Sequence, residues 1–368
     1  MATYYWVGGS GTWDNSSKTN WSTSSGGAGG SGPPVAADTV NFDANSGTAA
    51  TVTVAATAAC TTCTINKSDI NLSLSGSPTF GGIMTLTTGT ITLGSNTLTV
   101  AQLASNNSNV RTIDFGTGKI VVSGGNGTVW NFQTNTNIVI SGTPVVDFTY
   151  SGSTGTRTIA NGNVAGGSAS NAISINIKSG TDTAAVGGFW NTVDFSGFAG
   201  TLTGSRTIYG DWTLSTGMTV GAASTATTFA GTSKTQKITS NGKTMDFPLT
   251  FNGANTTFAF QDAFTQGSTR AFTITNGTVQ LKAGATTTVG ALTTSGTNQK
   301  VLQSTSAGSQ ATLSQASGNA NLQYLTVKDI AATGGAKFNA LNNCITQGNN
   351  SGWYFAPQLG RPLPSFAF

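Results

Sequence analysis

The stretch Thr85–Arg111 reads TLTTGTITLGSNTLTVAQLASNNSNVR, and a diverged copy, TITNGTVQLKAGATTTVGALTTSGTNQK, spans Thr273–Lys300. Both copies place an apolar residue at every second position, with Thr or Asn between and Gly where the run must bend. This alternation is typical of β-strands, and the glycines supply the turns. One extra residue in the second copy shifts the frame, after which Arg111 matches Lys300. Repeated strand-and-turn units without helical stretches predict a solenoid or a stack of sheets.

The composition of the 368 residues agrees with this prediction. Charged residues make up only 8% of the chain, every acidic residue is Asp, and His is absent. An ordinary soluble domain is roughly 25% charged, and a chain without Glu lacks a residue that fills ordinary helices. The β-branched and aromatic residues recur every few positions, which disfavours disorder. We therefore predict an all-β fold, a repetitive β-solenoid (β-helix-like) or stacked β-sheets, with an elongated shape.

The sequence divides into three regions. Residues 1–47 form a Trp-rich N-terminal cap with a Gly/Ser loop, and residues 48–355 form the repetitive β-solenoid body, with its related units near 85–111 and 273–300. Residues 356–368, APQLGRPLPSFAF, form a Pro-containing C-terminal arm that cannot join a central sheet. The arm is either loose or docks on a neighbouring subunit through Arg361, Leu363, Phe366 and Phe368, which are the candidate partner-binding residues.

Three tryptophans mark the N-terminal region: Trp6, Trp13 and Trp21. A solenoid has an open end whose interior and strand edge must be covered, and large aromatic residues in a terminal unit serve that purpose. The alternative is a glycan-binding platform, in which these rings are exposed beside Asp14. Core-facing rings favour the cap and solvent-facing rings favour the platform. No calcium loop of the Asp-x-Asn-x-Asp-Gly type is present.

Two short tags recur in the middle of the chain. Asp-Phe occurs at 114–115, 147–148, 194–195 and 246–247, and Arg-Thr-Ile begins at Arg111, Arg157 and Arg206. Neighbouring residues on a strand face opposite ways, so the Phe can fill the core while the Asp faces water or caps a turn. We interpret the basic residues, which are spread singly along the chain, as a solvated surface.

Candidate catalytic residues are few. Without His, the standard Ser and Cys triads cannot form. Carboxylate pairs alone can hydrolyse glycosides, and Asp194 with Asp211 is the candidate pair, although nothing in the sequence brings them together. Cys60 and Cys63 with one further Cys cannot complete a zinc site of four N/S ligands within the chain, so we interpret them as buried thiols. If the segment is a strand, the two side chains face opposite ways. We predict no enzymatic activity, no metal site and no cofactor.

The net charge of +4 comes without a concentrated basic face, so nucleic acid is not an expected partner. The sequence begins MATYYWVGG and shows no secretory signal and no apolar run long enough to span a membrane. Membrane insertion is therefore not expected. The surface composition is typical of proteins that work outside the cytoplasm, and release by cell lysis reconciles that composition with the missing signal.

The segments WVGGSGTWDNSSKTNWS, LTTGTITLGSNTLTV, GSRTIYGDWTLSTGMTV and CITQGNNSGWYF resemble Gly/Thr/Asn-rich β-helical structural proteins of tailed-bacteriophage virions, of the decoration, head-fibre or tail-fibre type. The resemblance covers most of the chain but includes no catalytic motif. It implies a protein that is assembled into the virion in the host cytoplasm, together with other virion proteins, as a homotrimer. The chain lacks the separate anchoring domain of tail fibres and the evident acidic pair of tailspikes.

We therefore expect a non-enzymatic structural protein, a surface-exposed β-solenoid that decorates the capsid or tail and is held through its terminal segments. The alternative is a receptor- or glycan-binding tail-fibre adhesin, whose partner is a host surface glycan. A bacterial cell-surface adhesin is a third hypothesis, but it requires an export route that this sequence does not show.

Overall fold

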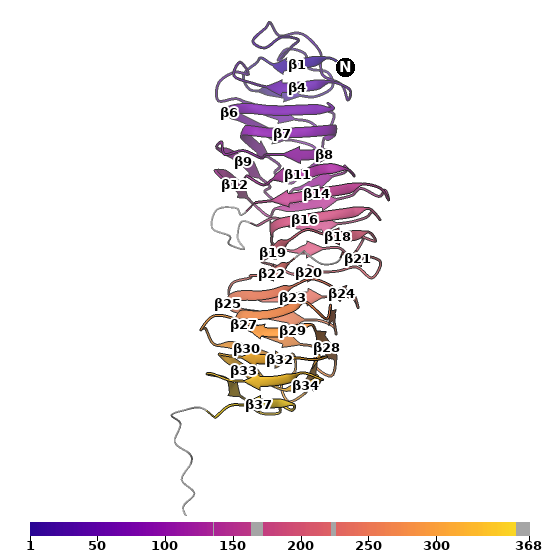
Figure 1. The fold of residues 1–368 in the computed structure, drawn as a ribbon. Coiled ribbons are helices and arrows are strands. Elements are labelled where there is room, and N and C mark those ends of the chain that lie inside the picture. Colours follow the sequence, from indigo (N-terminus) through magenta and orange to yellow (C-terminus); the bar gives the residue numbers. More distant parts are fainter. Residues whose placement is uncertain (135, 163–171, 222–225, 358–368) are drawn as a thin grey trace, which may run out of the picture. The chain divides into compact units, whose positions relative to one another are not determined.

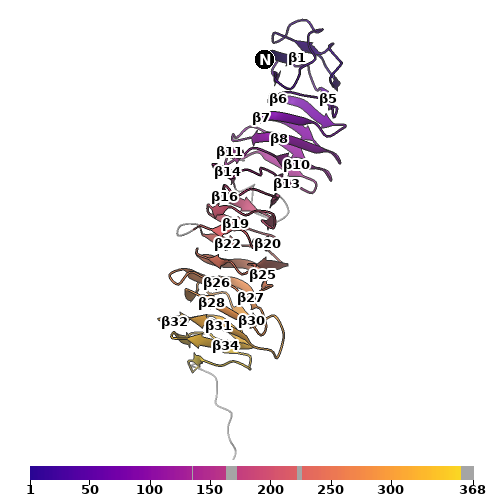
Figure 2. The ribbon, with the colours of Figure 1, turned by 90° about the vertical axis from the view of Figure 1, so that its right-hand side faces the viewer.

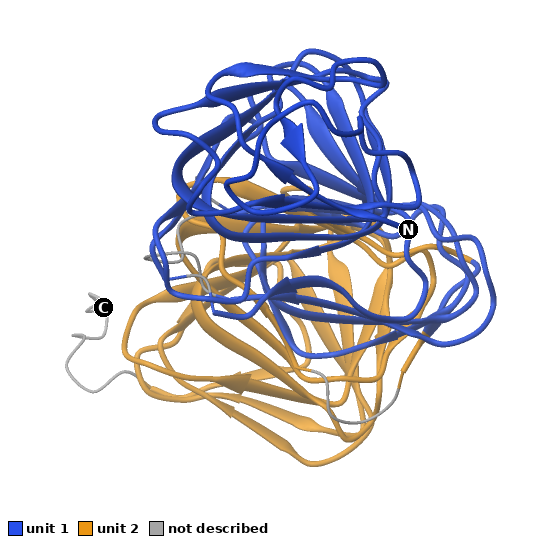
Figure 3. Ribbon diagram, turned by 90° about the horizontal axis from the view of Figure 1, so that it is seen from above, with its two compact units in different colours: residues 1–210, 217–219 blue, residues 211–216, 220–368 orange. Residues whose placement is uncertain are grey.

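The computed structural model describes residues 1–134, 136–162, 172–221 and 226–357. These residues contain strands and turns and no helix. The chain forms two compact units, Met1–Gly210 with Gly217–Thr219, and Asp211–Thr216 with Val220–Phe368, coloured blue and orange in Figure 3. The strands of the Trp-rich segment belong to the same sheet as the strands that follow them.

The first unit consists of strands that stack in sequence order (Figure 1). They are β1 (Thr3–Trp6), β2 (Gly11–Trp13), β3 (Trp21–Ser22), β4 (Thr39–Phe42), β5 (Thr51–Val54), β6 (Thr62–Leu74), β7 (Thr79–Thr92), β8 (Thr97–Ala104), β9 (Arg111–Asp114), β10 (Lys119–Val122), β11 (Gly127–Phe132), β12 (Ile138–Ser141), β13 (Val145–Phe148), β14 (Thr156–Asn161), β15 (Ser174–Ile177), β16 (Thr183–Trp190), β17 (Val193–Asp194), β18 (Thr201–Thr203) and β19 (Arg206–Ile208).

The second unit continues the same pattern. Its strands are β20 (Trp212–Thr213), the end of β21 (Thr219–Val220), β22 (Thr227–Phe229), β23 (Thr235–Thr239), β24 (Thr244–Met245), β25 (Leu249–Phe260), β26 (Thr265–Gln266), β27 (Ala271–Leu281), β28 (Thr286–Val289), β29 (Ala291–Thr294), β30 (Lys300–Ser304), β31 (Ala311–Gln315), β32 (Asn319–Leu322), β33 (Leu325–Lys328), β34 (Ile330–Gly334), β35 (Lys337–Ala340), β36 (Ile345–Thr346) and β37 (Trp353–Phe355).

Parallel pairing between successive turns identifies the fold as a β-solenoid. In the first unit one ladder runs β1–β4–β6–β7, a second runs β2–β5–β6–β7–β9–β12, and a third runs β8–β10–β13–β15–β17. In the second unit the ladders end at β36, at β37 and at a bridge from Ala331 to Ser351. Figure 2 shows the successive turns of each unit from a second direction. The predicted all-β solenoid is confirmed.

The strand repeat places the apolar residues inside. In β7 and β8, Leu86, Ile91 and Val100 are fully buried, while the threonines between them are partly exposed. Long strands bend where Gly takes a positive φ, as at Gly89 in β7 (101°) and Gly277 in β27 (88°). An added Cβ at Gly277 would lie 2.6 Å from the carbonyl oxygen of Gly253. Only Gly avoids both the strain and this clash.

The first strand edge is covered within the first unit. On one side β1 pairs in parallel with β4, and on the other it pairs antiparallel with β3, Tyr5 opposite Ser22 and Trp6 opposite Trp21. The Gly/Ser loop then crosses β3, because the backbone N–H of Ser31 donates to the carbonyl oxygen of Trp21 at 3.0 Å. Among the described residues, β36 and β37 have no later strand beside them.

Candidate functional site

The three N-terminal tryptophans are fully buried. Trp21 lies edge-on to Trp6, with ring centroids 4.9 Å apart, and to Trp13 at 5.4 Å, and Trp13 stacks on Phe80 at 5.0 Å. The indole N–H of Trp6 donates to the carbonyl oxygen of Gly9 at 3.0 Å. This is the core-facing orientation that the cap requires. The rings present no face to solvent, so they cannot stack on a sugar, and the predicted glycan platform is not formed by these residues.

Asp14, the polar member of that predicted platform, caps a turn. Its carboxylate accepts the backbone N–H groups of Ser16 at 2.8 Å and Ser17 at 2.6 Å, and both serine hydroxyls as well. The backbone hydrogen bond from Ser17, followed by the one from Ser16, lowers the pKa of Asp14 below its ordinary value. The other predicted contact residues, Arg361, Leu363, Phe366 and Phe368, lie outside the described residues.

Every Asp side chain takes part in hydrogen bonding within the fold. Asp194 accepts the backbone N–H of Ser196 at 2.8 Å, and Asp211 accepts that of Lys237 at 2.8 Å, so each of these two carboxylates is engaged in its own part of the chain. All twelve acidic side chains accept at least one hydrogen bond from the protein. They are Asp14, Asp38, Asp43, Asp69, Asp114, Asp147, Asp182, Asp194, Asp211, Asp246, Asp262 and Asp329.

The electrostatics of several of these carboxylates disfavour a role as a general acid. The pKa of Asp246 is lowered by the hydrogen bond from Arg270, and the pKa of Asp329 is lowered by the hydrogen bond from Asn349. The pKa of Asp38 also falls, because hydrogen bonds from the backbone N–H groups of Val35 and Ala2 outweigh the effect of burial. A general acid that works near neutral pH needs a carboxyl group whose pKa is raised.

The prediction for the Asp-Phe tags is confirmed for the Phe side chains, because Phe115, Phe148, Phe195 and Phe247 are buried. Asp114 and Asp194 cap turns as predicted. The prediction is wrong for Asp147, which is buried beside Phe148 and forms an ion pair with Lys119 on the preceding rung. Asp114 accepts the backbone N–H of Gly116 at 3.2 Å and the hydroxyl of Ser141 at 2.8 Å. The residue pair thus combines one core side chain with one turn or inter-rung contact.

Cys60 and Cys63 are both buried, so the interpretation as buried thiols is confirmed. The chain bends at Thr61, before β6 begins at Thr62, so the alternation of a strand does not extend back to Cys60 and the condition for opposite-facing side chains is not met. The side-chain hydrogen bond between Cys63 and Cys60, followed by burial, raises the pKa of the Cys63 thiol well above its ordinary value. The described residues contain no group of three or more side chains able to hold a metal ion.

Several basic side chains lie in the core, which corrects the interpretation of all basic residues as surface groups. Arg111, Arg157, Arg206 and Lys300 are at most 3% exposed. Arg157 forms an ion pair with Asp182 in which Nε and Oδ2 are 2.7 Å apart and both side chains are fully buried. The ammonium of Lys300 donates to the carbonyl oxygen of Gly296 at 3.1 Å and lies 5.5 Å from the ring centroid of Tyr324.

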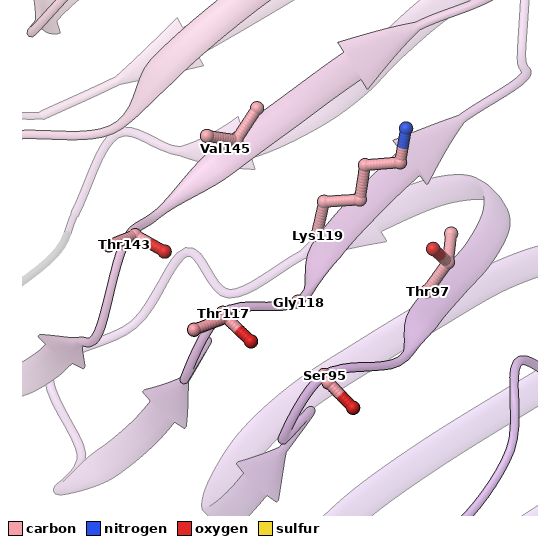
Figure 4. Close-up of a pocket in the computed structure, with 7 residues that line it drawn as sticks. All are labelled: Ser95, Thr97, Thr117, Gly118, Lys119, Thr143 and Val145. Atoms are coloured by element: carbon pink, nitrogen blue, oxygen red, sulfur yellow. The ribbon is translucent and has the colours of Figure 1, made fainter.

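A surface pocket of about 280 Å³ crosses three successive turns of the first unit (Figure 4). Thr97 of β8, Lys119 of β10 and Val145 of β13 lie in one column, because β10 pairs in register with both neighbouring strands. The column two residues earlier consists of Ser95, Thr117 and Thr143. The hydroxyl groups of these turns and the ammonium of Lys119 line the pocket.

The ammonium in this pocket is already neutralised. Lys119 Nζ lies 2.9 Å from Asp147 Oδ2, and the Asn176 amide donates to the other carboxylate oxygen at 2.7 Å. Although burial alone pushes the pKa of Asp147 upward, the hydrogen bonds from Asn176 and Lys119 outweigh it and lower the pKa below the ordinary value. The pocket offers hydrogen bonds to a polar ligand but no free acid or base.

The described residues form a β-solenoid in which all twelve Asp side chains accept hydrogen bonds from the protein. No family model, curated protein or solved structure matches the chain. None of the described residues forms a helix long and apolar enough to span a membrane.

Proposed function

We propose that the chain is a non-enzymatic structural protein of a tailed-phage virion, a surface-exposed β-solenoid that decorates the capsid or tail and is held through its terminal segments. The observation that carries the proposal is that all twelve carboxylates are engaged in turns, in ion pairs or between rungs. Where pKa shifts are resolved for Asp, they are downward.

The interior and the exterior support a scaffolding role in different ways. Three buried indole rings close the first turns, and fully buried charged groups such as Arg157 and Asp182 hold later ones. The exterior relies on hydroxyl and amide groups, since charged residues are only 8% of the chain. A hydroxyl-rich surface over a stacked, hydrogen-bonded core suits a protein that must stay folded outside the cell, where ATP-dependent chaperones do not act.

The test is to ask where the chain resides after infection by a phage that carries its gene. Virions purified on a density gradient are analysed by quantitative mass spectrometry and by immunogold labelling with an antibody raised against the purified chain. We expect the chain to copurify at a fixed ratio to the major capsid protein, with label on the particle surface. If the chain is instead found only in the lysate and is absent from infectious particles, the virion proposal is wrong.

A further inference from the structure

The last turn of the second unit carries a polar outer face built from three parallel strands. Asn321 of β32, Asn339 of β35 and Tyr354 of β37 lie opposite one another in register. Phe338 and Trp353 point to the opposite side, where their rings pack with centroids 5.3 Å apart. Because residues alternate along a strand, the Asn339 and Tyr354 side chains face outward together.

A surface pocket of about 350 Å³ lies on this face between β35 and β37, within the size range of small-molecule sites. Lys337 and Gly352, which precede Phe338 and Trp353 by one residue, both line it. Gly352 has a φ of 76°, and an added Cβ would lie 2.0 Å from the carbonyl oxygen of Ala332, so this position requires Gly.

The pocket carries an exposed aromatic ring on a fixed strand. Tyr354 is 57% exposed, whereas the next residue back, Trp353, anchors β37 through its indole N–H, which donates to the carbonyl oxygen of Ile330 at 3.1 Å. A tyrosine ring presents an apolar face and a polar tip. Such a ring can pack against the C–H face of a pyranose while the sugar hydroxyls stay hydrated or bind neighbouring polar groups.

The neighbouring amide is already oriented for such bonds. The Asn339 Nδ2 group donates to Asn321 Oδ1 at 2.8 Å, which leaves the carbonyl oxygen of Asn339 and the amide N–H groups of Asn321 available to a ligand. A hydroxyl group can both accept from one amide and donate to the other. The side-chain amides of Asn321 and Asn339 can therefore form hydrogen bonds with adjacent sugar hydroxyls.

The charge of the pocket is positive. The ion pairs found among the described residues use Lys67, Lys119, Arg157 and Arg270, and none involves Lys337. The strands β32, β35 and β37 read NANL, KFNA and WYF, so this sheet contains no acidic residue. An ammonium with no carboxylate partner on its own sheet favours an anionic group beside the aromatic ring.

We propose that this pocket binds an acidic saccharide, with a sugar carboxylate on Lys337 Nζ, a pyranose face on Tyr354 and sugar hydroxyls on the amides of Asn339 and Asn321. The site goes beyond the structural role proposed above. It also differs from the platform expected at the N-terminal tryptophans, because its aromatic ring is exposed.

The experiment titrates the purified full-length chain with digalacturonate and with its methyl ester, which keeps the sugar rings and removes the negative charge. We expect saturable binding of the acid in calorimetry or NMR, with a Kd of about 1 mM or below, and binding at least about tenfold weaker for the ester. Binding of the acid should weaken as salt is raised. If the acid shows no saturation at roughly 10 mM, or if acid and ester bind equally, the proposal is overturned.

Variants then locate the site. Tyr354→Ala should abolish measurable binding, whereas Tyr354→Phe should retain it, and Lys337→Gln should make the acid bind as weakly as the ester. Lys237→Gln, which removes an exposed lysine of β23 in the same unit, is the matched control and should bind like the unmodified chain. Unchanged binding by Tyr354→Ala would place the ligand elsewhere and overturn the assignment. Because binding is measured on the isolated chain, its failure does not bear on virion localisation.

Discussion

Arg111 and Lys300 occupy the same place in two related turns of the solenoid. Both side chains are buried, and neither belongs to an ion pair found among the described residues. Each begins a strand, β9 and β30, and each donates to a carbonyl oxygen of the loop before its strand. The sequence match between 85–111 and 273–300 thus extends to the hydrogen bonding of a core cation. In both turns the cation holds the loop against the strand that follows.

The first prediction concerns the Arg111 guanidinium. We expect Arg111→Ala to lower the free energy of unfolding by roughly 3–5 kcal/mol, because several buried carbonyl oxygens lose a charged donor. Arg111→Lys should lose less, since one ammonium can reach some of these acceptors. Urea unfolding measures the difference, with Lys237→Ala as the surface control. A loss below about 1 kcal/mol, typical of surface sites, would contradict this role. The acceptors are Ser105 O and Oγ, Asn109 O, Thr134 O and Thr136 O.

A second prediction concerns the buried ion pair of Arg157 and Asp182. Removing one partner leaves the other charge buried, so Asp182→Ala should destabilise the fold by roughly 3–5 kcal/mol. The double substitution Arg157→Met with Asp182→Leu replaces both charges with apolar groups and should recover most of that loss. A double-mutant cycle in urea measures the coupling. Additive losses from the two single variants would show that the contact is not energetically coupled.

The third prediction is a loss of stability in acid. Because the folded pKa of Asp147 lies below the unfolded value of about 3.9, its carboxylate stabilises the fold above that pH, and this contribution is lost as pH falls through the folded pKa. Thermal unfolding from about pH 6 to pH 2.5 should show a falling Tm, and Asp147→Asn should lose less Tm over this range. An Asp147→Asn profile parallel to that of the unmodified chain would contradict the prediction.

The fourth prediction separates folding from assembly. Deleting residues 356–368 removes one described backbone hydrogen bond, from Ala356 N–H to the carbonyl oxygen of Ala340, and should leave the circular dichroism and Tm of the chain nearly unchanged. The same deletion should abolish incorporation into virions. Substituting the Leu and Phe residues of this segment by Ser in the full-length chain is the matched variant. Wild-type occupancy by the truncated chain would refute the idea of an anchoring arm.

The strand pattern was predictable from sequence because alternation is a local property. In β7 and β8 the buried positions Leu86, Ile91 and Val100 follow directly from the spacing of apolar residues. The second copy also departs from the first in structure. The segment that matches the continuous strand β8 is divided into β28 and β29 at Gly290, where an added Cβ would lie 2.4 Å from the carbonyl oxygens of Arg270 and Gly267.

The burial of particular side chains was not predictable, because it depends on what the next turn brings. Arg111 and Lys237 are both single basic residues among Thr and Ile, yet one is buried by a loop and the other is exposed. Trp13 and Tyr354 are both aromatic residues of short strands. Trp13 is buried against Trp21 and Phe80, whereas Tyr354 faces outward. The pocket beside Tyr354 depends on the register of β35 and β37, which could not be predicted from the sequence. The resemblance to phage proteins does not predict the burial of these side chains either.

The covered first edge has a consequence for how copies of this chain can join. Because β3 occupies the side of β1 that β4 leaves free, and the backbone N–H of Ser31 in turn bonds to Trp21 of β3, the exposed side of β37 in one molecule cannot pair in parallel with β1 of another. Addition of a further rung at β1 is therefore blocked, although β1, β4 and β6 are joined by parallel pairing inside the molecule. The antiparallel strand acts as a terminator for the ladder that begins at β1.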